Sequence, residues 1–210
     1  MKKILLVGDS IRVGYDKYVK MAFEGVAHVY YPDENTRFAA YVCRNLDCWQ
    51  KWLCGDDIDV IHWNAGLWDD LILADGKHLT PINIYKEYVE RICVLIKLLF
   101  PRAKMIFATS TPVREPAHGP YGRLNKDTVE YNAVAVEIVK RYGGEINDLY
   151  SLAKAAPEEY HSDGTHYYTK EGTRMLTDQV VKCLEQTLGI RAKALDYDAL
   201  FTEPESIVGI

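Results

Sequence analysis

The chain has 210 residues, of which 48% are hydrophobic and 26% are charged, and its formal net charge is −5. This size and composition favour one well-filled globular core and exclude extensive disorder. The acidic balance and the lack of a dense Lys/Arg cluster argue against a nucleic-acid partner, and no apolar stretch is long enough to predict a membrane span.

The N-terminal segment predicts a core strand and not an export signal. Its apolar run from Ile4 enters Gly8-Asp9-Ser10 without a small-residue cleavage site. The five cysteines include no Cys-x-x-Cys pair, so we expect free thiols in a reducing compartment. These features together predict a cytoplasmic protein.

Short β-rich runs alternate with longer segments of helical period along the chain. Strands are expected over residues 4–7, 27–31, 58–63, 104–108 and 145–147. Helices are expected over residues 15–23, 38–53, 82–100 and 125–142, and a last one begins near Thr169, which can cap it. Repeated β-α units predict a three-layer α/β/α sandwich around a parallel sheet of about five strands.

The predicted domain covers residues 1–190, and residues 191–210 form a C-terminal extension. The extension mixes Tyr197, Leu200 and Phe201 with acidic residues. Packing of this segment on its own domain and packing on a second copy of the chain, in a homo-oligomer, are both open.

Two short polar motifs lie near opposite ends of the chain. Ser10 follows the first strand, where a strand-to-helix turn directs a hydroxyl and backbone N–H groups into one space. In Asp163-Gly164-Thr165-His166 the carboxylate can reach one ring nitrogen while the other faces outward. Taken alone, the first motif also fits a helix cap and the second a surface loop. Together they predict Ser10 as a nucleophile, His166 as its base and Asp163 as the group that orients His166.

With these two motifs, the chain resembles the SGNH (GDSL-type) hydrolases over about residues 3–188. That family has Gly-Asp-Ser after its first strand and Asp-x-x-His before its last helix, matched here by Gly8-Asp9-Ser10 and Asp163–His166. The resemblance implies the flavodoxin-like fold of that family and a serine esterase that forms an acyl-enzyme and needs no cofactor.

The resemblance also implies an oxyanion hole. The family places an asparagine after the third strand, and Asn64 stands there, although Gly-x-Asn-Asp becomes His62-Trp63-Asn64-Ala65. A family glycine after the second strand has no counterpart in residues 31–38. We therefore expect the Ser10 N–H, Asn64 and either Asn35 or a neighbouring amide as donors.

Side chains near these blocks predict a cleft that accepts a polar ester or stacks on a sugar ring: Arg37, Trp63 and Trp68. Aromatic residues at such positions are also common in cores. The spacing of four histidines does not suit a metal site: His62, His78, His118 and His161. No Gly-rich phosphate loop is present either, so no metal or cofactor is expected. The favoured substrate is a short acyl ester, acetyl on a carbohydrate.

Three other functions are compatible with this sequence to different degrees. A lysophospholipase or thioesterase acting on longer acyl chains is open, because the fold does not decide the substrate. A catalytically silent carbohydrate-binding domain is also open, although both nucleophile and base are present. A flavodoxin-like nucleotide binder is disfavoured, because the Asp9 carboxylate stands where a phosphate would lie.

Overall fold

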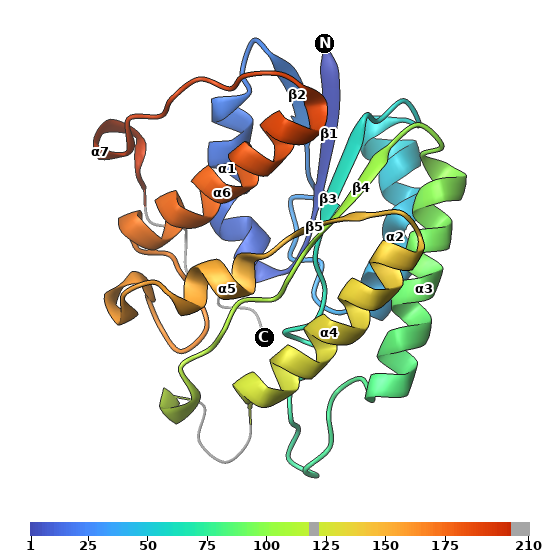
Figure 1. Cartoon of the computed structure of the whole chain (residues 1–210), viewed down its shortest axis with the longest axis vertical. Helices are drawn as coiled ribbons and strands as arrows, with labels where there is room; N and C mark the ends of the chain where they lie inside the picture. The colour runs from blue at the N-terminus through green and yellow to red at the C-terminus, as the bar shows by residue number, and fades with distance from the viewer. Residues whose placement is uncertain (118–121, 203–210) are drawn as a thin grey trace.

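The computed structural model describes residues 1–117 and 122–202 (Figure 1). Within these residues, five parallel strands form one sheet in the order β2-β1-β3-β4-β5. The strands are β1 (Lys2–Val7), β2 (Ala27–Tyr30), β3 (Val60–Trp63), β4 (Lys104–Ala108) and β5 (Glu145–Asn147). The predicted α/β class and all five predicted strands are confirmed.

Helices cover both faces of the sheet (Figure 1). One face carries α1 (Ser10–Ala22), α5 (Leu149–Lys154) and α6 (Lys170–Leu188), and the other carries α2 (Ala39–Trp49), α3 (Ile82–Leu99) and α4 (Asn125–Arg141). Successive side chains of a strand point to opposite faces, so Ile4 and Leu6 pack with α1 and α6 while Leu5 and Val7 pack on the other face. Burial on both faces explains the continuous apolar runs of the strands.

Helix α1 begins at Ser10, earlier than the predicted start at Tyr15. The reason is local, because Asp9 caps the helix by accepting a hydrogen bond from the Ile11 N–H at 2.9 Å. Helix α6 begins as predicted, with the Thr169 hydroxyl accepting from the Gly172 N–H at 3.1 Å. Helix α2 is shorter than expected and continues as a π-helical turn over Gln50–Cys54.

The order of the strands fixes where a ligand can approach the sheet. The crossover through α1 places β2 on one side of β1, and the crossover through α2 places β3 on the other. The strand order therefore reverses between β1 and β3, and ligands of open α/β sheets bind beyond the carboxyl ends of the strands at such a point. Asn64 directly follows β3, and Ser10 follows β1 after Gly8 and Asp9.

Residues 191–202 pack along α1 and α6. The Lys193 N–H donates to the Ala22 carbonyl at 2.9 Å. The Tyr18 ring lies 5.7 Å from the ring of Tyr197, in the short helix α7 (Tyr197–Leu200), and 6.4 Å from that of Phe201. This part of the extension packs on its own domain, and its remainder, residues 203–210, lies outside the described residues.

All five cysteines fall within the described ranges and are free thiols. Among the described residues, none of the helices combines the length and the hydropathy that a membrane span requires.

Candidate active site

Ser10 occupies the first position of α1, directly beyond the end of β1. The first N–H groups of a helix have no acceptor within the helix, so the Ser10 amide belongs to a set of donors that favour an anion. Asp9, which caps the helix, is fully buried. Burial raises the pKa of the Asp9 carboxyl, and hydrogen bonding from Asn64 and the Ile11 amide opposes this rise.

His166 links the hydroxyl of Ser10 to the carboxylate of Asp163. Its Nε2 lies 2.8 Å from Ser10 Oγ and its Nδ1 lies 2.7 Å from Asp163 Oδ2. The other oxygen of Asp163 accepts the N–H groups of Thr165 and His166, each at 2.7 Å. Partial burial acts to raise the pKa of Asp163, but hydrogen bonds from His166 and Thr165 outweigh it and hold that pKa below its usual value. The carboxylate is therefore fixed in its charged form beside the imidazole.

Gly8 allows Asn64 to lie against the turn that carries Ser10. A Cβ on Gly8 would lie 2.0 Å from Asn64 Oδ1 and 2.7 Å from Arg12 Cβ, which no real side chain tolerates. The Asn64 N–H donates to the Val7 carbonyl at 3.0 Å, and the residue is only 3% exposed. The glycine is thus required for close approach of the two strand ends.

The loop after β2 docks on the same turn. The Thr36 N–H donates to the Gly8 carbonyl at 3.1 Å, and Asn35 Oδ1 accepts the Arg37 N–H at 2.9 Å. Arg37 has φ +51°, in the left-handed region that favours glycine. The buried Arg12 guanidinium holds this loop from below, because its Nη1 donates to the Pro32 carbonyl at 3.0 Å.

The structure resembles those of several solved hydrolases, although no protein-family model and no curated protein matches the sequence. A lipase/acylhydrolase from Enterococcus faecalis is 20% identical with a TM-score of 0.68, over 93% of this chain and 100% of that one. A carbohydrate acetylesterase family member from Sinorhizobium meliloti is 17% identical with a TM-score of 0.69, over 90% and 100%. A member of the lipolytic G-D-S-L family from Veillonella parvula is 16% identical with a TM-score of 0.66, over 87% and 97%. The chain has the SGNH hydrolase fold.

Within the SGNH hydrolase fold, Arg37 stands in the loop where the family glycine was expected. Its positive φ is the conformation that a glycine would adopt without strain. Its N–H is bonded to the Asn35 side chain, so Asn35 uses its oxygen in a local turn. A contribution of Asn35 to an oxyanion hole stays a prediction.

The three predicted substrate residues lie in different surroundings. Trp63 is 1% exposed and packs edge-on against Phe107, with ring centroids 4.8 Å apart. Its prediction as a substrate residue is wrong, because β3 is a central strand of the SGNH hydrolase fold and both of its faces are covered. Trp68 is half-buried, and the Arg123 guanidinium lies 6.0 Å from its ring centroid. Arg37 is also half-buried, with its guanidinium 5.5 Å from the Tyr41 ring centroid.

Sequence reasoning missed a set of buried charges beside the Asn64 segment. Asp69 accepts the Ala39 N–H with both oxygens, at 3.2 and 3.1 Å, and so pairs the first N–H of α2, which has no acceptor within the helix. Asp70 accepts the Thr128 hydroxyl at 2.6 Å and lies 3.9 Å from the Arg123 guanidinium. Burial raises the pKa of Asp69 to about 7 and that of Asp70 to about 6. Motif spacing could not have predicted these contacts, because they join residues far apart in the chain.

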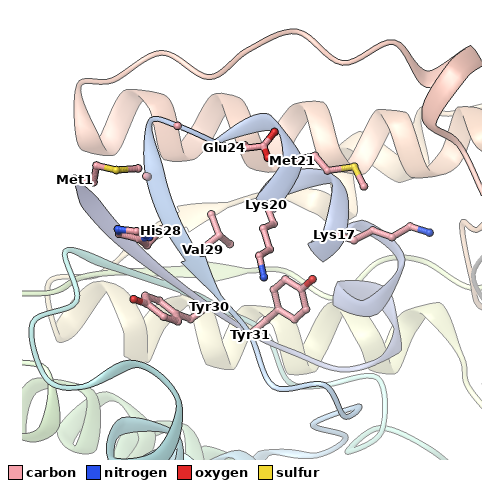
Figure 2. Close-up of a pocket in the computed structure, with 11 residues that line it drawn as sticks. Met1, Lys17, Lys20, Met21, Glu24, His28, Val29, Tyr30 and Tyr31 are labelled. Atoms are coloured by element: carbon pink, nitrogen blue, oxygen red, sulfur yellow. The ribbon is translucent and has the colours of Figure 1, made fainter.

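A cavity of about 560 Å³ lies on the outer side of β2 and is separate from this site. Figure 2 shows Lys20 of α1 reaching over Tyr31, with Tyr30 and Val29 of the β2 segment beside it. Its lining comes from Met1, α1, β2 and the residues flanking β2, and not from the segments that carry His166 or Asn64. The cavity at the sheet edge and the Ser10–His166 pair therefore lie in different parts of the molecule.

No group of three or more His, Cys, Asp or Glu side chains among the described residues is arranged to hold a metal ion. His62 lies in the core, with its Nε2 3.0 Å from Asn147 Nδ2. Burial lowers the pKa of His62 to about 4, so this histidine is neutral near pH 7.

Proposed function

We propose that the chain is a serine ester hydrolase that works through an acyl-enzyme. The observation that carries this proposal is the unbroken series from Ser10 Oγ to His166 Nε2 at 2.8 Å and from His166 Nδ1 to Asp163 Oδ2 at 2.7 Å. A serine hydroxyl becomes a nucleophile when a positioned base takes its proton. Asp163 holds the imidazole in the required tautomer and stabilises the imidazolium that forms.

In the first half of the reaction, Ser10 Oγ bonds to the ester carbonyl carbon while its proton passes to His166. The carbonyl oxygen becomes an oxyanion, for which the Ser10 N–H and the Asn64 side chain are the proposed donors. His166 then gives the proton to the leaving alcohol as the C–O bond breaks. In the second half, water attacks the acyl-enzyme with His166 again as base, and Ser10 is released.

The proposed substrate is a short acyl ester, acetyl on a carbohydrate. Half-buried Trp68 lies in the segment that follows Asn64, and half-buried Arg37 lies in the loop that docks on Gly8 through Thr36. An aromatic face with charged neighbours suits a sugar ring. The acetylesterase from Sinorhizobium meliloti, with the same fold, supports this class. A silent carbohydrate-binding domain is less well supported, because such a domain would have no need of an oriented base beside Ser10.

The test is hydrolysis of a chromogenic acetate ester by the wild type and by Ser10→Ala, followed by esters of increasing chain length and a panel of acetylated sugars. We expect activity in the wild type alone, falling with chain length and highest on acetylated sugars. Equal background rates in the wild type and in Ser10→Ala would contradict the esterase and favour the carbohydrate-binding domain. Faster hydrolysis of esters with long acyl chains would contradict the proposed acetylesterase and favour a lysophospholipase or thioesterase.

A further inference from the structure

Tyr168 lies against both members of the Ser10–His166 pair. Its ring stacks on the imidazole of His166, with centroids 4.7 Å apart and an interplanar angle of 25°. Its hydroxyl donates to the Ser10 carbonyl at 2.5 Å. The segment that carries the base and the helix that carries the nucleophile are therefore joined twice, once through Ser10 Oγ and once through Tyr168.

Gly14, one helical turn after Ser10, makes room for the Tyr168 ring. A Cβ on Gly14 would lie 2.7 Å from Cε1 and 2.9 Å from Cδ1 of Tyr168, closer than real Cβ contacts come. Gly14 lies inside helix α1, where glycine is a poorer helix former than alanine. A glycine is required at position 14 because any side chain would clash with the Tyr168 ring. The backbone angles of Gly14 are ordinary.

The hydroxyl of Tyr168 is kept as a donor by its surroundings. Burial raises the pKa of this phenol above its ordinary value, and the nearby carboxylates of Asp9 and Asp163 act in the same direction. The phenol therefore stays protonated near neutral pH and can donate to the Ser10 carbonyl.

We propose that Tyr168 is a positioning residue, which fixes the His166 ring relative to the turn that carries Ser10. Its own ring lies in a notch, the space left by the missing side chain of Gly14. This inference rests on the proposed function of the same site. His166 lies in a loop, where Asp163 and Ser10 hold only the edges of its ring, and the stack on Tyr168 restrains the ring through its face. A misplacement of about 1 Å at reacting groups can cost roughly 10²-fold in rate, so a stacked neighbour affects turnover without touching substrate.

Two substitutions separate the hydroxyl from the ring. Tyr168→Phe keeps the ring stack and removes the hydrogen bond to Ser10, and we expect kcat to fall about tenfold. Tyr168→Leu removes both the stack and the hydrogen bond, and we expect kcat to fall about a hundredfold. KM for the acetate ester should stay within about twofold in both, because the groups that bind substrate are retained. Tyr131→Phe is the control, because it removes a similar bond to the Thr80 carbonyl, 2.6 Å long, away from Ser10. It should lower the unfolding temperature and leave kcat unchanged.

The notch is tested by a double-mutant cycle between Gly14 and Tyr168. Gly14→Ala should lower kcat in the wild type, because the new methyl group displaces the tyrosine. In a Tyr168→Ala background the same change should cost no further kcat and should raise the unfolding temperature, since alanine is the better helix former. An equal loss in both backgrounds would overturn the notch, and full kcat in Tyr168→Leu would overturn the positioning role.

Failure of the proposed function gives a different result from failure of this inference. A wild type that hydrolyses no ester contradicts the esterase itself, while the unfolding temperatures of the cycle still report the contact between Gly14 and Tyr168. An active wild type whose Tyr168 variants keep full kcat contradicts only the positioning role.

Discussion

The two sides of the candidate active site differ in how completely their polar groups are paired. On one side, Asp163 accepts from two backbone amides and from His166, which in turn meets Ser10. On the other side, Asn64 Oδ1 and Thr36 Oγ1 are buried and have no hydrogen-bond partner in the described part of the chain. Arg37 in the same loop has a backbone angle that a glycine would adopt more easily.

This difference shows which half of the site is held by contacts within one segment and which half depends on contacts between segments. The base and its carboxylate come from one short segment, whose internal hydrogen bonds fix their geometry. The side with Asn64 is assembled from two strand ends and a loop that depend on each other, through Gly8 and Thr36. Its departure from the family pattern is therefore where we expect this chain to differ from its structural neighbours.

The largest expected effect tests the fully paired side. His166→Ala should lower kcat by about 10⁴-fold or more, because the hydroxyl of Ser10 loses its base. Asp163→Asn should approach the same loss, since the amide favours the wrong tautomer of the imidazole. Steady-state kinetics on the acetate ester measures both, and His28→Ala, at an exposed position on the sheet edge, is the control. A loss below about tenfold in His166→Ala would contradict its role as the base.

The next effect tests the side with unpaired polar atoms. Asn64→Ala should lower kcat by about 10²–10³-fold with little change in KM, because a donor to the oxyanion matters most in the transition state. Asn45→Ala, on the outside of α2, is a matched control that should leave kcat unchanged. Wild-type kcat in Asn64→Ala would show that this side of the candidate site works without the asparagine.

A third prediction concerns pH and the buried carboxyl of Asp69. Its pKa is raised in the folded state to about 7, so the unfolded chain releases this proton at lower pH. Asp69 therefore lowers stability as pH rises from about 4 to about 7, by at most about 1.4 kcal/mol per pH unit. Urea unfolding at several pH values should show that Asp69→Asn removes this decline.

The control for that experiment is Asp75→Asn, which changes an exposed carboxylate. It should leave the pH profile of stability as in the wild type. A decline that persists in Asp69→Asn would assign it to other groups, of which Asp70 is the first to examine, since burial raises its pKa to about 6.

The smallest expected effect tests whether the loop after β2 depends on the backbone conformation of Arg37 or on its side chain. Arg37→Gly should keep kcat within about threefold, because glycine adopts the left-handed conformation without strain. Arg37→Val should lose more activity, since a β-branched side chain resists that conformation. If both variants lose the same activity, the arginine side chain and not the backbone shape is what the site uses.

Much of the fold could be predicted because buried parallel strands leave continuous apolar runs, as Ile4 to Val7 shows. The start of α1 was harder, because the capping contact of Asp9 precedes any helical period. Trp63 was assigned to the cleft by its neighbours in sequence, and the sequence does not tell that both faces of β3 are covered.

The candidate site could be predicted in part, for a similar reason. Ser10, Asp163 and His166 lie in short motifs whose chemistry can be inferred locally. Tyr168 and Arg123 act through contacts with residues distant in the chain, such as the bond from Tyr168 to Ser10, and no spacing encodes them. Contacts of this kind form only in the folded sheet, which brings distant segments together, so they cannot be inferred from local sequence.

The measurement that tests the central claim most directly is covalent labelling by an organophosphonate, read by mass spectrometry of the intact protein and of its peptides. We predict a single label on Ser10 in the wild type and almost none in His166→Ala, at equal fold stability. A wild type that stays unlabelled, or a label on another residue, would contradict an activated serine at this site.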